Sequence, residues 1–293
     1  MKNTPLFHQT ATALITPFTN GKIDFAALSR LIEYQLEGGV KTIVLCGTTG
    51  ESATLTPSEK QSLFSFAGAE YGNHATLIAG CGTCDTMGSL ALTHMASASG
   101  VHGILAVTPY YNKPSAEGLY QHYKALSRAT DLPIIVYQVP GRTGIRIAAD
   151  LWKRLSALPN IVGLKDAGGD IAMSARYLNA SDIPVYSGND DSIVPLMSIG
   201  GMGCISVISN LMPARIQAMT EAAEAGDTAK AAKIQLSILP LVDALFSQTN
   251  PIPVKWALSR LGFCRADWRL PLTEPSEETK RLLEREMEAA DLL

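Results

Sequence analysis

The chain has 293 residues, of which 46% are hydrophobic, and this is enough to bury a large core in one domain or in two smaller ones. Its formal net charge is −3 and it has no block of basic residues, so charge gives no reason to expect a partner among nucleic acids or anionic membranes. The N-terminus lacks the layout of a signal peptide and no apolar run approaches the length of a membrane span, so we expect a cytoplasmic protein.

Apolar, β-branched runs alternate with amphipathic segments along the chain. The expected strands are 12–16, 42–47, 76–80, 103–109, 133–140, 161–165, 184–188 and 204–209, and the expected helices are one that starts near Asp24 and those near 58–71, 86–99, 115–129, 148–157, 170–179, 190–199 and 212–225. Strands without polar alternation are buried on both faces, as parallel strands are.

Eight strand–helix units in about 225 residues predict an α/β fold, a closed (β/α)₈ TIM barrel. An open doubly wound sheet is the structural alternative, but the even size of the units and the lack of a nucleotide-binding fingerprint disfavour it. We expect residues 1–226 to form the catalytic barrel and residues 227–293 to form a C-terminal helical extension.

Polar side chains follow several of the expected strands, at the end where active sites of this fold lie. These positions are Gly47-Thr48-Thr49-Gly50-Glu51, Thr108-Pro109-Tyr110-Tyr111-Asn112, Tyr137, Arg142, Lys165 and Ser187-Gly188. Hydroxyls, phenols, a guanidinium and an amine are not the ingredients of a metal centre, and the five histidines have no ligand spacing. The sequence therefore predicts an active site without a metal.

Lys165 ends the apolar strand 161–165, where the parity of the strand points it into the barrel. Burial disfavours the charged form of an amine, and a neutral amine can form a Schiff base with a ketone. The structural alternative is a lysine that reaches solvent or pairs with Asp166. The polar residues at the neighbouring strand ends favour catalysis.

The neighbouring residues suit this chemistry. Tyr137 can carry the protons that imine formation requires, with Thr48 or Tyr111 relaying them, although a lone tyrosine is more often an ordinary core residue. The Gly47–Gly50 turn can aim backbone N–H groups at a carboxylate, and Arg142 offers a fork for a second one. A plain tight turn and a surface arginine are the structural alternatives.

Several motifs, taken in order, resemble the dihydrodipicolinate synthase branch of the pyruvate-dependent Schiff-base lyases. They are GTTGE at 47–51, TPYYN at 108–112, the block from Tyr137 to Arg142, GLK at 163–165, SG at 187–188 and NPIPVKWAL at 250–258. Each is weak alone, but the ordered set extends from about residue 8 to the C-terminal region. The family also contains N-acetylneuraminate lyase and keto-deoxy sugar-acid aldolases.

The resemblance implies an enzyme of the class I aldolase type that condenses pyruvate with L-aspartate 4-semialdehyde, giving 4-hydroxy-tetrahydrodipicolinate for lysine and diaminopimelate biosynthesis. No separate cofactor is implied, because pyruvate is held covalently. Family members are commonly tetramers built as dimers of dimers. The implied residues are Lys165 for the imine, Tyr137 and Thr48 for proton transfer, Tyr111 reaching the partner subunit's site, and Thr49, Arg142, Gly188 and Ile205 for substrate binding.

Two features favour the sugar-acid lyases instead. Gln138 replaces the asparagine usually found after the shuttle tyrosine, and Asp190-Asp191 is an acidic pair where the sialic-acid lyases bind sugar hydroxyls. Arg142 outweighs both, because it suits a small substrate with a carboxylate. A catalytically inert binding protein on the same scaffold is a further alternative, which the full set of catalytic groups disfavours.

The resemblance also extends to the lysine-binding site of feedback-inhibited members. Ser52, Ala53, Leu55 and Tyr110 match that site, whereas Pro57 and Lys60 replace histidines, Cys84 replaces an asparagine and Gly88 replaces a glutamate. The lost amide and carboxylate leave the ammonium groups of lysine without partners, and Lys60 repels them. We therefore expect weak inhibition by L-lysine, or none.

Five cysteines are spread over the chain without framework spacing, which indicates reduced and mostly buried thiols. Cys81 and Cys84 form a CxxC motif, which can indicate redox chemistry or half of a zinc site. Because no second pair and no nearby histidine accompanies it, we interpret this motif as structural.

Overall fold

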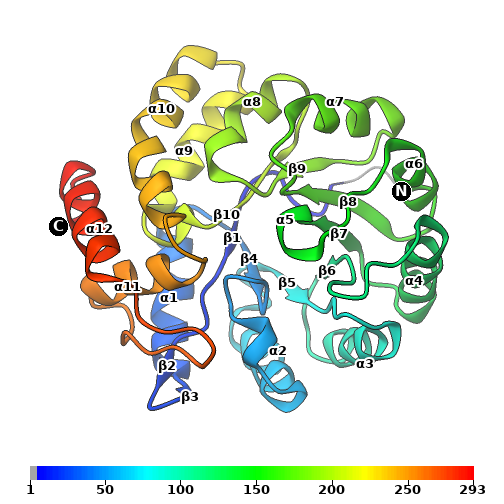
Figure 1. Ribbon diagram of the computed structural model, residues 1–293, viewed down its shortest axis with the longest axis horizontal. Coiled ribbons are helices and arrows are strands. Elements are labelled where there is room, and N and C mark those ends of the chain that lie inside the picture. Colours follow the sequence, from blue (N-terminus) through cyan, green and yellow to red (C-terminus); the bar gives the residue numbers. More distant parts are fainter. Residues whose placement is uncertain (1–4) are drawn as a thin grey trace.

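The computed structural model describes residues 5–293, so residues 1–4 of the predicted barrel domain lie outside the described part. Eight parallel strands form a closed barrel in the order β1-β10-β9-β8-β7-β6-β5-β4, and pairing of β4 with β1 completes the ring (Figure 1). They are β1 (Gln9–Ala13), β4 (Thr42–Leu45), β5 (Thr76–Gly80), β6 (Gly103–Val107), β7 (Ile134–Gln138), β8 (Ile161–Asp166), β9 (Val185–Ser187) and β10 (Gly203–Ser206). The predicted TIM barrel is confirmed.

A ring of helices surrounds the barrel (Figure 1). Its members are α1 (Phe25–Glu37), α2 (Pro57–Tyr71), α3 (Thr86–Ser97), α4 (Ala116–Ala129), α6 (Ala149–Ser156), α7 (Ile171–Ala180), α8 (Ile193–Ser198) and α9 (Pro213–Glu224). Helix starts follow local capping chemistry: the Asp24 carboxylate accepts the N–H of Ala27, and Thr56 with Glu59 forms a capping box at α2.

Three predicted elements are wrong in their bounds. The strand expected at 204–209 is Gly203–Ser206, and a 3₁₀ turn follows at Ile208–Asn210. The first strand is Gln9–Ala13 rather than 12–16, because Leu14 and Ile15 are buried in the core between strands and helices and so continue the apolar run past the strand. The predicted helix 190–199 is a 3₁₀ turn at Asp190–Ser192 followed by α8.

The sequence prediction missed two small elements. Strands β2 (Phe18–Thr19) and β3 (Lys22–Ile23) form a hairpin around Asn20-Gly21, whose φ angles are 53° and 72°. An Asn-Gly pair between short strands is a recognised signal for such a turn. The short helix α5 (Pro140–Thr143) follows β7 and carries Arg142.

Side chains alternate between the barrel interior and the layer beneath the helices. The interior cluster contains Val44, Ile78, Leu105, Ile135, Tyr137, Tyr186 and Ile205. Ile134 and Val136, which flank Ile135 on β7, belong to the outer core instead. This alternation places Tyr137 inside the barrel and Gln138 outside it.

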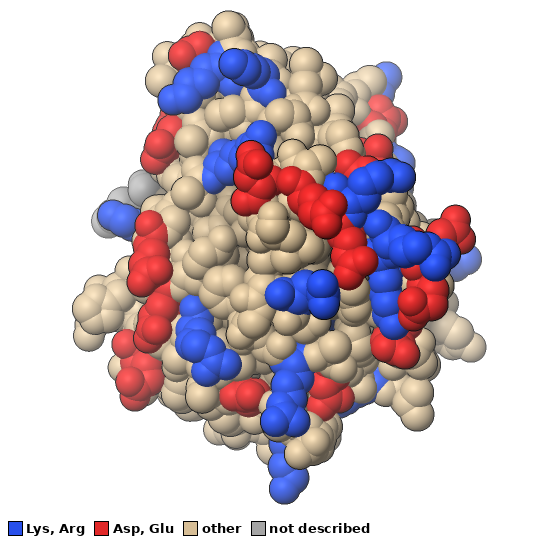
Figure 2. Space-filling view, turned by 90° about the vertical axis from the view of Figure 1, so that its left-hand side faces the viewer, with Lys and Arg blue, Asp and Glu red and all other residues tan. Residues whose placement is uncertain are grey.

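Three C-terminal helices, α10 (Thr228–Leu245), α11 (Ile252–Arg260) and α12 (Glu277–Ala289), lie on one side of the barrel near α9 and α1 (Figure 1). α12 packs on α10 and α11 through the fully buried Leu283 and Met287. On the face beside these helices, acidic and basic side chains are interspersed without a patch of one sign (Figure 2). Within residues 5–293 no helix combines the length and the apolar character that crossing a membrane would need.

Candidate active site

A cavity of about 300 Å³ opens at the C-terminal end of the barrel strands. Its wall includes Cys46, Gly47, Thr48, Glu51, Ser52, Tyr110, Tyr137, Val139, Arg142, Thr249, Asn250, Pro251, Pro271 and Leu272. Residues from the C-terminal extension therefore form part of the wall. The volume lies at the lower end of the range for small-molecule sites, which suits ligands of a few carbon atoms.

Lys165 lies on β8 beside Tyr137 of β7, and the two residues are register partners. The Lys165 side chain is inside the barrel and the residue is only 5% exposed, with Nζ 4.4 Å from the centroid of the Tyr137 ring. Asp166 occupies the opposite face, where it accepts hydrogen bonds from Gln138 and Ser174. The alternative of a Lys165–Asp166 pair is therefore wrong.

Gly188 and Ile205 lie at the same end of the barrel. A methyl group on Gly188 would stand 3.0 Å from Cε of Lys165 and 2.7 Å from Cβ of Ala167, so only glycine fits beside the amine. Ile205 on β10 is fully buried and belongs to the same interior cluster as Tyr137.

The segment Gly47–Glu51 follows β4 and borders the cavity. Thr48 lines the wall, while Thr49 is buried and its Oγ1 accepts a hydrogen bond of 3.0 Å from Nδ2 of Asn250. The N–H of Glu51 donates to the carbonyl of Thr48 at 3.1 Å, which closes a tight turn.

Arg142 lies at the mouth of the cavity. α5 presents it, and its Nη2 donates to the carbonyl oxygen of Asn250 at 2.9 Å. This hydrogen bond holds the guanidinium at the rim, and the other N–H groups of the guanidinium can bind an anion.

Tyr111 does not join the other predicted residues. It is 93% exposed, does not line the cavity, and has a left-handed backbone with φ of 72°. Such a conformation is uncommon for a bulky residue and marks positions with a special role. Within residues 5–293, the hydroxyls of Tyr137, Thr48 and Tyr111 make no hydrogen bond with one another.

Gln138 and Asp190, which belong to the two features that favoured sugar-acid lyases, have structural roles. Gln138 points away from the cavity, donates to Tyr177 and Asp166, and accepts the N–H of Ile147. Asp190 is buried, which raises its pKa, and one of its oxygens accepts the N–H groups of Val207 and Ile208 at 3.0 and 2.8 Å. Neither of these two side chains lines the cavity.

Sequence reasoning assigned no role to Asn250 or Glu51, although both line the cavity. The Asn250 amide nitrogen binds Thr49, and its Oδ1 is buried without a partner among residues 5–293. The motif NPIPVKWAL contained the signal, because an asparagine before two prolines and a lysine within an apolar helix are unusual in a plain core segment.

All five thiols are free, and three of them, Cys46, Cys81 and Cys204, are buried. Burial raises the pKa of Cys81, whose Sγ donates to the carbonyl of Leu92, and this fits a structural thiol. In the described part of the chain no group of three or more histidine, cysteine or acidic side chains is placed to hold a metal ion.

Comparison with known proteins matches residues 6–290 to the model of the dihydrodipicolinate synthetase family. A 4-hydroxy-tetrahydrodipicolinate synthase of Thermotoga neapolitana is 44% identical over 294 residues, covering 98% of this chain and 100% of the relative.

Two solved structures are also similar. The dihydrodipicolinate synthase of Thermotoga maritima superposes with a TM-score of 0.96 at 42% identity, covering 98% of this chain and 100% of that one. A monomeric dihydrodipicolinate synthase variant gives the same TM-score and identity and covers 98% of each chain. The chain belongs to the dihydrodipicolinate synthetase family.

Proposed function

We propose that this protein is a 4-hydroxy-tetrahydrodipicolinate synthase, which condenses pyruvate with L-aspartate 4-semialdehyde. The observation that carries the proposal is the placement of the buried Lys165 amine 4.4 Å from the centroid of the Tyr137 ring, which itself lines a cavity of matching size. Family membership and the full-length relative support it.

In the first half-reaction the Lys165 amine attacks the ketone of pyruvate, and water leaves as the imine forms. Tyr137 moves protons to and from the carbinolamine oxygen, and Thr48 relays them. Backbone N–H groups of the 47–51 turn, with Thr49 among them, bind the pyruvate carboxylate, and the backbone of Gly188 and Ile205 borders the bound ketone. Loss of a C3 proton then gives the enamine.

In the second half-reaction the enamine carbon attacks the aldehyde of the semialdehyde, whose carboxylate Arg142 binds at the rim. The substrate amine then attacks the imine carbon and displaces Lys165, which closes the ring and returns the free amine. The carbon skeleton of both substrates is retained and one water is released. This chemistry uses no separate cofactor.

We further propose that the active form is a homotetramer built as a dimer of dimers, in which Tyr111 completes the partner subunit's site. The exposure of Tyr111 and its left-handed backbone support a role outside its own subunit. A location in the cytoplasm stays a prediction.

The expected insensitivity to L-lysine also stays a prediction. Ser52, Ala53 and Tyr110 line the cavity wall, and Lys60 is buried on α2, which lowers its pKa. Burial favours the neutral amine of Lys60, so the predicted insensitivity rests on the amide and the carboxylate lost at Cys84 and Gly88 rather than on repulsion by Lys60. In a steady-state assay we expect an inhibition constant of about 1 mM or weaker, which corresponds to about −4 kcal/mol of binding free energy. Sub-millimolar inhibition would contradict this.

Borohydride reduction in the presence of pyruvate, followed by peptide mass mapping, tests the proposed function. We expect a pyruvyl adduct on Lys165 and none in Lys165→Ala, with Lys60 as an internal control for another buried lysine. If no adduct forms on the wild-type chain, the result would contradict the proposed enzyme and favour the alternative of a catalytically inert binding protein. A panel of aldehydes then tests the second substrate, and faster cleavage of N-acetylneuraminate or a keto-deoxy acid would contradict the assignment.

A further inference from the structure

Side chains from distant parts of the chain hold the turn Gly47–Glu51. Thr16 Oγ1 donates to the carbonyl of Gly50 at 2.7 Å, and Asn250 donates to Thr49 at 3.0 Å. The third anchor is an ion pair between Lys255 on α11 and the Glu51 carboxylate. Two of these three anchors therefore come from the C-terminal extension.

The Lys255–Glu51 pair is completely enclosed, since both side chains are 0% exposed. Lys255 Nζ also donates to the carbonyl of Asp267 at 3.0 Å, and it lies 4.2 Å from the ring centroid of Phe18. The second carboxylate oxygen of Glu51 accepts the N–H of Arg269 at 3.4 Å. Both oxygens of Glu51 thus have partners from the extension.

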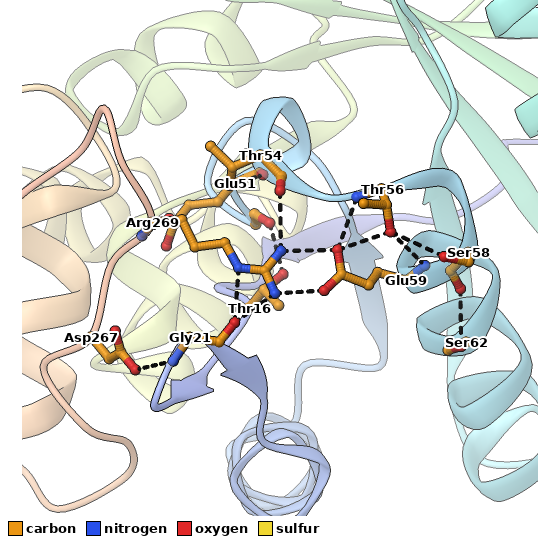
Figure 3. Close-up of polar contacts among 11 residues, drawn as sticks. Thr16, Gly21, Glu51, Thr54, Thr56, Ser58, Glu59, Ser62, Asp267 and Arg269 are labelled. Atoms are coloured by element: carbon orange, nitrogen blue, oxygen red, sulfur yellow. Dashed lines mark hydrogen bonds and ion pairs between the residues drawn. The ribbon is translucent and has the colours of Figure 1, made fainter.

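Arg269 lies beside Glu51, one member of this pair (Figure 3). Its guanidinium lies between the carbonyl of Gly21 and the carboxylate of Glu59, with Nη2 bonds of 2.7 and 2.5 Å (Figure 3). It also covers Phe18 at 4.3 Å from the ring centroid. Two cationic groups, those of Lys255 and Arg269, therefore lie near the ring of Phe18. These contacts fix the extension against the hairpin and the start of α2.

The turn itself has an unfavourable backbone. Cys46, which precedes the turn, and Glu51, which ends it, both have φ of 53°, a left-handed conformation that is rare for residues other than glycine. Such a conformation persists only where surrounding contacts over-determine it. The Lys255 ion pair acts directly on one of these two residues, so losing it would release Glu51 and move the N–H groups of the turn.

We infer that Lys255 is a positioning residue, which acts through Glu51 to hold the 47–51 turn in the shape that binds the carboxylate of pyruvate. The inference rests on the proposed function, because it assigns the turn to that carboxylate. Lys255 touches no reacting atom, and its role is separate from the amine chemistry of Lys165.

Lys255→Met and Glu51→Gln test this role. For Lys255→Met we expect the KM for pyruvate, and the pyruvate concentration that half-saturates borohydride trapping on Lys165, to rise about tenfold or more. We expect the KM for the semialdehyde at saturating pyruvate to stay within about twofold of wild type. In the double variant that combines Lys255→Met with Glu51→Gln, the KM for pyruvate should exceed that of Lys255→Met by no more than about twofold, because both changes break the same contact. A purely structural pair would lower only the melting temperature.

Glu59→Gln is the matched control, because it removes the charge of the neighbouring ion pair with Arg269 but leaves the Lys255–Glu51 pair in place. It should lower the melting temperature and leave the pyruvate dependence unchanged. If Lys255→Met does not fold by circular dichroism, Glu51→Gln decides, with an expected shift of about threefold because it keeps an acceptor but loses the charge.

If Lys255→Met or Glu51→Gln folds and has the pyruvate dependence of the wild type, the inference is overturned. The proposed function still stands in that case, provided that pyruvate is trapped on Lys165 of the wild-type protein. Equal shifts in Glu59→Gln would also overturn it, since they would make the effect general to the network. Absence of trapping in the wild type would overturn the proposed function and this inference together.

Discussion

His122 on α4 is buried, and this burial lowers its pKa to about 4 although the Asp85 carboxylate acts in the opposite direction. Its Nδ1 lies 3.0 Å from Thr86 Oγ1, and its Nε2 has no partner within residues 5–293. Unfolding returns the imidazole to water, where its pKa is about 6.5. The unfolded chain therefore binds a proton between these pH values that the folded chain does not.

This difference predicts a loss of stability as pH falls from about 6.5 to about 4, on the order of 3 kcal/mol in total. His122→Gln keeps a partner for Thr86 but does not titrate, so urea unfolding of this variant should depend less on pH within that window. The hydrogen bond from Arg269 lowers the pKa of Glu59 to about 2. The stabilisation that Glu59 contributes is therefore lost only as pH falls below about 4.5, mostly outside the window of His122. Parallel pH dependence in His122→Gln and wild type would contradict the prediction.

Gly188→Ala should disable the enzyme while leaving it folded. The new methyl group would stand 3.0 Å from Lys165 Cε and 2.7 Å from Ala167 Cβ, which displaces the amine from its place beside Tyr137. We expect kcat to fall about 100-fold, measured with both substrates saturating, together with slower borohydride trapping.

Gly141→Ala is the control for this change, because a methyl group there meets nothing within 4 Å although the position adjoins Arg142. It should retain nearly all activity. Similar losses of activity in Gly188→Ala and Gly141→Ala would contradict the explanation that a methyl group at position 188 collides with Lys165 and Ala167.

At the scale of elements, the contact of α2 with the turn after α3 depends on Gly68. A methyl group at this position would stand 1.9 Å from the carbonyl oxygen of Ser99, so Gly68→Ala forces the helix and the turn apart. We expect the free energy of unfolding to fall by about 1–3 kcal/mol, measured by urea denaturation.

Gly118 on α4 offers the opposite case, since a methyl group there meets no atom closer than 3.5 Å. Gly118→Ala should raise the free energy of unfolding by about 0.5–1 kcal/mol, because alanine has the higher helix propensity and a less flexible unfolded state. If Gly68→Ala and Gly118→Ala both destabilise the protein, the cause is a general effect of alanine in these helices and not the clash with Ser99.

The sequence predicted the regular elements because their signals are local. Apolar runs located six of the eight barrel strands to within two residues, and caps such as Asp24 located helix starts. It placed β1 too late, since burial of Leu14 and Ile15 has the same sequence signature as strand pairing. Strand parity also placed Lys165 beside Tyr137 correctly.

Contacts between distant segments were outside the reach of such patterns. The role of Glu51 depends on Lys255, which is 204 residues away, and nothing in the local sequence at either residue specifies the other. The orientation of Gln138 could have been predicted, because an inward Tyr137 requires an outward neighbour. The role of Asp190 could not, because it follows from the backbone of Val207 and Ile208.

At the scale of the whole molecule, the proposed exchange of Tyr111 between subunits predicts complementation. Lys165→Ala and Tyr111→Phe should each be weakly active alone. Mixed 1:1 and reassociated at random, they form hybrid dimers in which one site has both Lys165 and the partner's Tyr111, so about a quarter of all sites are intact. Activity of the mixture relative to wild type measures this fraction.

Lys165→Ala mixed with Tyr137→Phe is the control, because Lys165 and Tyr137 lie side by side within one chain. A hybrid of these two variants contains no intact site and should recover nothing. Equal recovery in both mixtures, or none in the Tyr111 mixture, would contradict the exchange of Tyr111 between subunits.

The long-range anchors of the 47–51 turn have a consequence for synthesis on the ribosome. The turn is translated early, but Asn250, Lys255 and Arg269 follow about two hundred residues later, and β1 closes the barrel only when β10 pairs with it. A nascent chain therefore carries Lys165 long before the 47–51 turn has its anchors. Chains that stop before residue 269 would emerge without all the anchors of the turn, so we expect ligand binding to report translation at least as far as residue 269.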